Sequence, residues 1–228
     1  MKKLFLIILI SIIVFSCKRT ESSNMTSDVI YGKTLDKLLK DTILPIKDSS
    51  EIKHFVMVIA PRAFRDEEFK IPYEYLTGLG HKIKVASRDT ILATGLLGLA
   101  LKPQITVKEI DTLAFDGMIL VGGTGAAIYW DDLLLHQMIR HFSQRPHKLI
   151  AAICLAPITL ARAGILTNKK ATVFKDRFTL NEFKQKQVLY VESGVVISGN
   201  VITAASPQDA DKFAKAIALK AMRLKSQL

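Results

Sequence analysis

Cysteine is scarce in this chain, which has only Cys17 and Cys154 among its 228 residues. A disulfide between them would join the end of an N-terminal leader to a turn that follows a buried apolar run. The short reach of a disulfide makes that pairing implausible. The two cysteines therefore need separate explanations.

Several signatures of ligand binding are also missing. The glycine-rich segment 121–125 is not followed by Gly-Lys-Ser/Thr, so it is not a P-loop. No other nucleotide fingerprint and no cluster of metal-ligating residues is present, and the sequence therefore predicts no cofactor and no metal. It also contains no internal repeat and no low-complexity tract.

Acidic residues are outnumbered, 21 against 32 Lys and Arg, and the net charge is +11. Removal of residues 1–16 would take away Lys2 and Lys3 and no acid, which leaves +9. The basic residues are scattered and no nucleic-acid-binding motif accompanies them, so nucleic acid is not an expected partner.

The N-terminus has the pattern of an export signal. Lys2 and Lys3 precede the apolar run Leu4–Phe15, which is too short to span a bilayer comfortably. The run ends at Ser16 and Cys17, and this junction resembles a bacterial lipoprotein signal, in which the cysteine is acylated. We predict a protein that is exported and lipid-anchored to a membrane of the bacterial cell envelope, on the periplasmic side. The alternative is an ordinary secretory signal in which Cys17 is incidental.

The chain divides into three parts. Residues 1–16 are the predicted signal peptide, residues 17–50 a polar, lipid-anchored tether with a possible helix at Tyr31–Leu39, and residues 51–228 one domain.

The domain alternates apolar runs with helical patterns. Near-continuous apolar runs are typical of parallel strands buried on both faces. The predicted strands are Phe55–Ala60, Lys82–Ser87, Gly117–Val121, Lys148–Ile153 and the hairpin Val195–Ser198 with Val201–Ala204. The predicted helices are Glu67–Thr77, Asp131–Ser143, Ala156–Ala163 and a last one opened by Ser206 and Pro207. The pattern predicts an α/β sandwich around a mostly parallel sheet.

Cys154 is the main candidate for chemistry. It lies between the strand Lys148–Ile153 and the helix Ala156–Ala163, at a sharp strand-to-helix turn. A helix N-terminus favours thiolate, so we expect a lowered thiol pKa. The alternative is a buried structural cysteine.

Two further segments should meet Cys154 at the carboxyl edge of the sheet. Gly122, Gly123 and Gly125 follow one predicted strand, and glycines allow backbone N–H groups to approach a ligand, although a plain tight turn has the same pattern. Glu67 and Glu68 begin a helix, where acids usually complement the dipole. A protonated Glu68 could also donate a hydrogen bond to a thiolate.

Taken together, these segments resemble the ThiJ/PfpI superfamily, which includes protein deglycases and PfpI-type peptidases. The resemblance covers about residues 53–224. It is carried by Phe55–Ala60, Glu68–Pro72, Gly80–Ser87, Phe115–Gly123, Ala151–Pro157, Ala163–Leu166 and Ile202–Pro207. It implies a three-layer α/β/α sandwich, flavodoxin-like and similar to class I glutamine amidotransferases.

The resemblance also implies roles for individual residues. Cys154 matches the nucleophile, Glu68 the carboxylic acid that contacts it, and the backbone of Gly123 and Leu155 the oxyanion-hole donors. It further implies a homo-oligomer, and the apolar segment Leu92–Leu101 is a surface that needs covering.

One departure from the family pattern concerns histidine. PfpI-type peptidases have His directly after the cysteine, where this chain has Leu155, and the deglycase branch has a later His where this chain reads Ala171–Lys175. The predicted strands place His54, His81 and His147 at the opposite edge, and we expect His136 and His141 on a helix surface. Peptidase activity is not expected, and a base would be Glu68 or a group from a partner subunit.

Two functions remain open. One is a cysteine-dependent hydrolase, glyoxalase or deglycase that acts on small carbonyl compounds or their protein adducts. The other is a non-catalytic redox-sensing or chaperone-like stress protein in which Cys154 is oxidised to a sulfinate held by Glu68. A purely structural scaffold is a third reading, but it gives no reason for a thiol at a helix start.

Overall fold

The computed structural model describes residues 29–41 and 52–224. Its main sheet has the strand order β1-β12-β13-β9-β8-β2-β4-β7. These strands are β1 (Val29–Tyr31), β2 (His54–Val58), β4 (Lys82–Ser87), β7 (Ile105–Thr106), β8 (Gly117–Leu120), β9 (Leu149–Ile153), β12 (Val195–Ser198) and β13 (Val201–Ala204). The run from β13 to β7 is parallel, and the pairs β12–β13 and β1–β12 are antiparallel.

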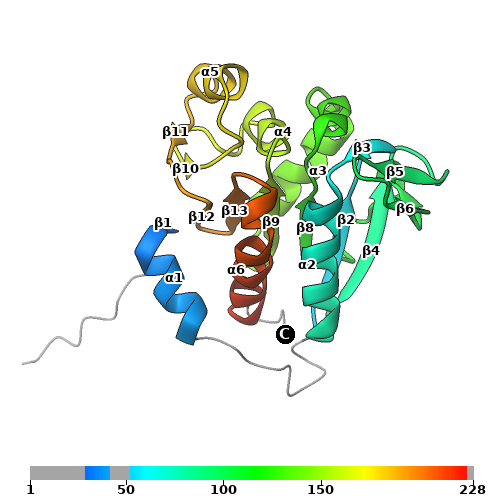
Figure 1. The fold of residues 1–228 in the computed structure, drawn as a ribbon, viewed down its shortest axis with the longest axis horizontal. Helices are drawn as coiled ribbons and strands as arrows, with labels where there is room; N and C mark the ends of the chain where they lie inside the picture. The colour runs from blue at the N-terminus through cyan, green and yellow to red at the C-terminus, as the bar shows by residue number, and fades with distance from the viewer. Residues whose placement is uncertain (1–28, 42–51, 225–228) are drawn as a thin grey trace, which may run out of the picture.

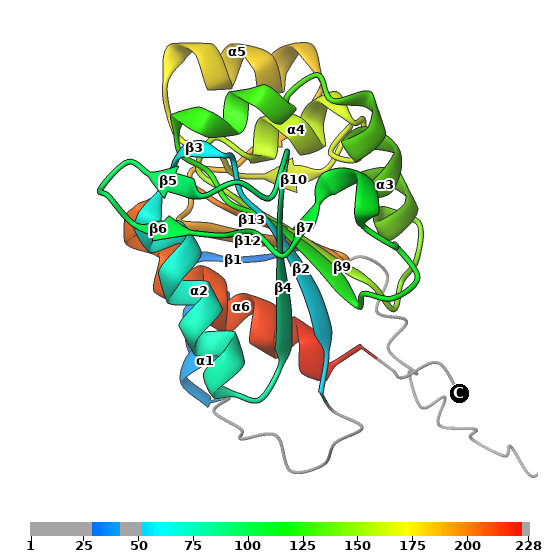
Figure 2. The same cartoon turned by 90° about the vertical axis from the view of Figure 1, so that its right-hand side faces the viewer.

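Helices cover both faces of this sheet. The elements on one face are α1 (Gly32–Asp41), α2 (Asp66–Gly78) and α6 (Ala210–Met222), and α3 (Leu133–Ser143) lies on the other (Figures 1 and 2). Two shorter helices, α4 (Pro157–Arg162) and α5 (Arg177–Gln185), lie beyond the carboxyl ends of the strands. Every residue of β8 and β9 is buried, because both faces of these strands are covered.

The predicted α/β fold with a mostly parallel central sheet is confirmed. The strand Lys82–Ser87 and the hairpin around Gly199 and Asn200 have the predicted bounds, and the other predicted elements differ by one to three residues. The last helix is divided: the 3₁₀ turn η4 (Pro207–Asp209) follows Ser206, and α6 begins at Ala210.

The segment that the sequence assigns to a tether contributes to this fold. β1 pairs with β12 over three residues, and the expected short helix is present as α1. Leu35 of α1 is fully buried, and Asp36 forms an ion pair of 2.7 Å with Lys212 of α6. Residues 29–41 are therefore packed against the domain. The predicted signal peptide and Cys17 lie outside the described residues.

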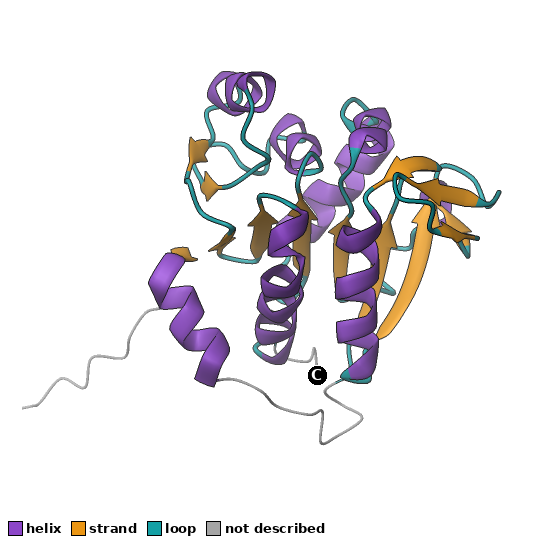
Figure 3. Cartoon of the chain, in the orientation of Figure 1, coloured by secondary structure: helices purple, strands orange, loops and turns teal. Residues whose placement is uncertain are grey.

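A small second sheet lies beside α2 and contains most of the segment Leu92–Leu101. It pairs β3 (Arg62–Phe64), β5 (Ala93–Gly95) and β6 (Ala100–Leu101), as Figure 3 shows. Asp66 joins it to α2, because its carboxylate accepts hydrogen bonds from the N–H groups of Leu97 and Leu99 at 2.9 and 2.7 Å. The side chains of Leu92, Leu96 and Leu97 remain exposed.

The remaining elements connect this framework. They are the pair β10 (Lys170–Ala171) and β11 (Leu189–Tyr190), and the 3₁₀ turns η2 (Val107–Glu109) and η3 (Thr124–Tyr129).

Candidate functional site

Cys154 occupies a constrained turn at the end of β9. Its φ is 62°, in the left-handed region that residues with a Cβ rarely adopt. Two backbone hydrogen bonds of 2.9 Å hold it there: its N–H donates to the carbonyl of Ala204, and its carbonyl accepts from the N–H of Phe174. Strained backbone of this kind persists only where the surroundings fix it, and it is enriched at functional sites.

Glu68 lies in the first turn of α2 and is completely buried. Its Oε2 accepts a hydrogen bond of 3.0 Å from the N–H of Gly122. Its Oε1 has no hydrogen-bond partner among the described residues. Burial raises the pKa of this carboxyl to about 7, against the opposing effects of Cys154, Gly122 and Arg65. A carboxyl with a pKa near neutrality can both accept and release a proton at physiological pH.

The Cys154 thiol and the Glu68 carboxyl form an interacting pair. Each alters the pKa of the other: Cys154 lowers the pKa of the carboxyl, and the carboxylate charge raises the pKa of the thiol. Oε1 has no hydrogen-bond partner among the described residues, so the carboxyl and the thiol are coupled neighbours with no hydrogen bond between Sγ and Oε1.

The predicted lowering of the thiol pKa was wrong. Burial first, and then the charge of Glu68, raise the pKa of Cys154 to about 12. The backbone N–H groups of Gly123 and Leu155 lower it, but not enough to compensate. The helix start favours the thiolate, but burial, which leaves only 7% of Cys154 exposed, outweighs that effect on the thiol pKa. In the absence of substrate the sulfur therefore carries a proton at neutral pH.

The glycines after β8 allow this close packing. A Cβ on Gly122 would lie 2.5 Å from Oε2 of Glu68 and 2.7 Å from Cβ of Cys154. Gly123 has a φ of 90°, and its Cβ would lie 2.5 Å from the backbone N of Arg65. The four predicted site residues Cys154, Glu68, Gly123 and Leu155 thus meet at one point of the carboxyl edge.

No histidine contact to Cys154 is found among the described residues. His54, His81 and His147 lie at the starts of β2, β4 and β9, at the opposite end of these strands from Cys154. The expectation that His136 is a surface residue was wrong: it is 5% exposed, and its Nε2 lies 3.0 Å from the carbonyl oxygen of Trp130. His141 is half-buried against the hydroxyl of Thr112.

Sequence reasoning missed an aromatic surface next to the cysteine. The indole Nε1 of Trp130 donates a hydrogen bond of 3.3 Å to the carbonyl of Leu155, and the Trp130 ring stacks on Phe178 of α5. Phe174, which donates its N–H to Cys154, occupies the region where the sequence lacks the expected histidine. The replacement of the expected histidine in this region was the one signal in the sequence that pointed to the aromatic surface.

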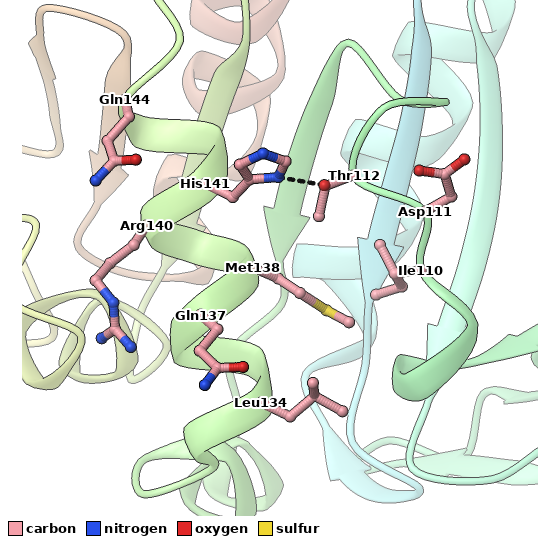
Figure 4. Close-up of a pocket in the computed structure, with 9 residues that line it drawn as sticks. All are labelled: Ile110, Asp111, Thr112, Leu134, Gln137, Met138, Arg140, His141 and Gln144. Atoms are coloured by element: carbon pink, nitrogen blue, oxygen red, sulfur yellow. Dashed lines mark hydrogen bonds between the residues drawn. The ribbon is translucent and has the colours of Figure 1, made fainter.

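A separate groove of about 570 Å³ lies between α3 and the loop that precedes β8 (Figure 4). Leu134, Met138 and His141 line it from α3, and Thr112 lines it from the loop. None of the four predicted site residues contributes to it. Across residues 29–41 and 52–224, no group of His, Cys, Asp and Glu is arranged to hold a metal ion. Within the same ranges, no helix combines the length and apolar character that crossing a membrane requires.

Comparison with known proteins agrees with this architecture. Residues 54–220 match the DJ-1/PfpI family. An uncharacterized protein of Methanocaldococcus jannaschii is 38% identical over 159 residues, which cover 69% of this chain and 77% of that protein. A protein of Pyrococcus horikoshii that is named as a deglycase is 27% identical over 155 residues, 68% of this chain and 91% of that protein. Among solved structures, a ThiJ/PfpI domain protein from Brachyspira murdochii superposes with a TM-score of 0.71 at 26% identity, over 77% of this chain and 99% of that one.

Proposed function

This chain belongs to the DJ-1/PfpI family, and we propose that it is a cysteine-dependent enzyme of the hydrolase, glyoxalase or deglycase type. Its substrates are small carbonyl compounds or the adducts that such compounds form on proteins. In this proposal Cys154 is the nucleophile, Glu68 is the base, and the N–H groups of Gly123 and Leu155 bind the developing oxyanion. The similarity to a deglycase supports the substrate class.

One observation carries the proposal. Oε1 of Glu68 is buried, lacks a hydrogen-bond partner among the described residues and belongs to a carboxyl with a pKa of about 7. An unsatisfied buried acceptor is costly and needs an explanation, and a role as acceptor of the thiol proton supplies one. A nucleophile normally requires such a neighbouring base.

The first step balances without a cofactor. The proton moves from Sγ of Cys154 to Oε1 of Glu68, and a sulfur electron pair forms a bond to the carbonyl carbon. The carbonyl π pair moves to the oxygen, where the N–H groups of Gly123 and Leu155 stabilise it. Return of the proton from Glu68 to this oxygen gives a neutral hemithioacetal and restores the carboxylate.

Steady-state turnover of methylglyoxal tests the proposal. We expect activity in the wild-type protein and its loss in Cys154→Ser and Glu68→Gln, with unchanged circular dichroism in both variants. Activity that persists in Cys154→Ser would exclude Cys154 as the nucleophile.

The alternative is a redox-sensing or chaperone-like stress protein. Two features favour it. Among the described residues no histidine contacts Cys154, and Glu68 in its protonated form could donate a hydrogen bond to a sulfinate. In that case mild peroxide oxidises the Cys154 sulfur to the sulfinate, peroxide is reduced to water, and no carbonyl substrate turns over. Mass spectrometry of the peptide that contains Cys154 distinguishes the two functions.

Location and assembly are further parts of the proposal. An acylated Cys17 would anchor the protein in the cell envelope, and the intact mass of membrane-extracted protein decides this. The exposed side chains of Leu92, Leu96 and Leu97 support a homo-oligomeric contact through the segment Leu92–Leu101. Light scattering should then give at least twice the monomer mass.

A further inference from the structure

Three aromatic residues next to Cys154 form a surface that we call the aromatic ledge: Trp130, Phe174 and Phe178. The N–H of Phe174 donates to the carbonyl of Cys154 at 2.9 Å, and Nε1 of Trp130 donates to the carbonyl of Leu155 at 3.3 Å. Phe178 stacks on Trp130 with 5.2 Å between ring centroids and 24° between planes. Trp130 and Phe178 are thus placed beside the cysteine turn by their rings, and Phe174 by its backbone.

Two of its three members, Phe174 and Phe178, are exposed although they are large and apolar, and Trp130 is half-buried. Phe174 is 41% exposed and Phe178 is 45% exposed. By contrast, Cys154 and Glu68 are 7% and 0% exposed, so little room lies immediately around the thiol. A substrate whose carbonyl reaches Cys154 must therefore extend its remaining atoms away from the thiol, and the ledge is an exposed apolar surface bonded to residues of the same turn.

Ion pairs of Arg162 hold the ledge in place and neutralise the positive charge beside it. The guanidinium of Arg162 lies 5.5 Å from the centroid of the Trp130 ring. The same guanidinium binds the carboxylates of Asp131 at 2.7 Å and Glu182 at 2.8 Å. The neighbouring cation is therefore already compensated, and the ledge offers the exposed rings of Phe174 and Phe178 rather than a site for an anion.

We propose that the aromatic ledge is the specificity-determining surface of the Cys154 site, and that it selects carbonyl compounds that bear a flat aromatic group. This inference rests on the proposed function, because it presupposes that Cys154 adds to carbonyls. Ring faces favour a planar π partner over a small polar one, by offset stacking and by apolar burial. The ledge makes and breaks no bond; it positions the group attached to the reacting carbon.

Reaction of Cys154 with a matched pair of electrophiles tests the inference without turnover. The reagents are N-phenylmaleimide and N-methylmaleimide, the protein is the full chain, and peptide mapping measures addition at Cys154. Relative to the same pair on free cysteine, we expect the phenyl reagent to be favoured about threefold to tenfold. Phe178→Ala should abolish the preference. Leu113→Ala, which removes another exposed apolar side chain that is not part of the ledge, should retain it.

A binding measurement covers the case in which Cys154 reacts with neither reagent. Trp130 is the only tryptophan in the chain, so selectively excited tryptophan fluorescence reports on the ledge. In Cys154→Ser, N-phenylsuccinimide should quench this fluorescence at lower concentration than N-methylsuccinimide. Equal quenching, or the same reagent ratio as free cysteine, overturns the inference. Phenyl preference with no carbonyl turnover would instead refute the proposed enzymatic function and leave the ledge assignment intact.

Discussion

Each edge of the central sheet buries a titratable side chain, but the two side chains differ in their hydrogen bonding. At the amino edge, His81 is 3% exposed and its Nδ1 accepts a hydrogen bond of 3.2 Å from the backbone N–H of Lys53. At the carboxyl edge, Glu68 is fully buried and one of its two oxygens has no partner among the described residues. The amino edge uses its buried polar group to complete the fold, whereas the carboxyl edge leaves an acceptor free next to a thiol.

Backbone geometry shows the same contrast. Cys154 and Ala63, both near the carboxyl edge, have φ values of 62° and 56°. Gly122 touches Glu68 and Cys154 so closely that no Cβ fits. Gly78, at the far end of α2, has no atom within 4 Å of a Cβ position. The strained backbone of Cys154 and Ala63 thus lies at the edge that chemistry would use.

The largest effect is expected from Gly122→Ala. The new Cβ would meet Oε2 of Glu68 at 2.5 Å, the carbonyl of Ile153 at 2.6 Å and Cβ of Cys154 at 2.7 Å. Two of these neighbours cannot move without displacing β9, so we expect a loss of about 3 to 4 kcal/mol in the free energy of unfolding. Urea denaturation measures it. Gly78→Ala is the matched control, because Gly78 lies at the other end of α2 from Glu68, and it should change stability by less than about 1 kcal/mol. Equal losses in both variants would contradict the contrast between the two edges of the sheet.

The next effect is a dependence of stability on pH that Glu68 causes. Its pKa is about 7 in the folded protein and near 4.5 when exposed, so the folded state binds the extra proton between these values. The free energy of unfolding should therefore fall as pH rises from about 4.5 to 7, by roughly 3 kcal/mol, and then level off. Glu68→Gln keeps an acceptor for the N–H of Gly122 but cannot ionise. The difference in stability between wild type and this variant should follow that curve, and a difference independent of pH would show that burial does not raise the pKa of Glu68.

Sequence patterns were sufficient for the framework of the fold. Continuous apolar runs identified β8 and β9 because these strands are buried on both faces, and Gly199 with Asn200 identified the hairpin. The association of Cys154 with Glu68 followed from parallel topology and family resemblance. The thiol pKa did not follow, because it depends on how far the surrounding atoms exclude water, which no local pattern encodes.

Other features depended on contacts between distant segments. The packing of α1 onto α6 needs Leu35 to be buried and Asp36 to meet Lys212, two residues separated by most of the chain. The buried ring of His136 pairs with the carbonyl of Trp130, which the turn after η3 brings close to it. The aromatic ledge joins residues from the turn after η3, the loop before α5 and α5 itself, and no single one of these segments predicts it.

A smaller effect is expected on the reactivity of the thiol. Because the charge of Glu68 contributes to the raised pKa of Cys154, Glu68→Gln should lower that pKa. Alkylation of Cys154 by iodoacetamide at pH 8 should become about tenfold faster, which corresponds to one pKa unit. Carbonyl turnover should nevertheless be lost in the same variant, because the proton acceptor is gone. Slower alkylation in Glu68→Gln would mean that Glu68 stabilises the thiolate in the wild-type protein.

The smallest effect on Cys154 is expected from the amino edge, where His81 titrates in the opposite sense to Glu68. Burial, together with the charge of Lys53, lowers the pKa of His81 to about 4, from an ordinary value of 6.5. The unfolded chain therefore binds the extra proton between these values, and the contribution of His81 to stability is lost as pH falls from about 6.5 to 4. His81→Gln offers the N–H of Lys53 an amide oxygen and does not titrate, so the difference in unfolding free energy between this variant and wild type should change over that range and be constant above pH 7. Its effect on alkylation of Cys154 should be absent, since β4 separates the two edges. If His81→Gln altered the reactivity of Cys154 as strongly as Glu68→Gln, the two edges would be coupled and the division of roles between them would be wrong.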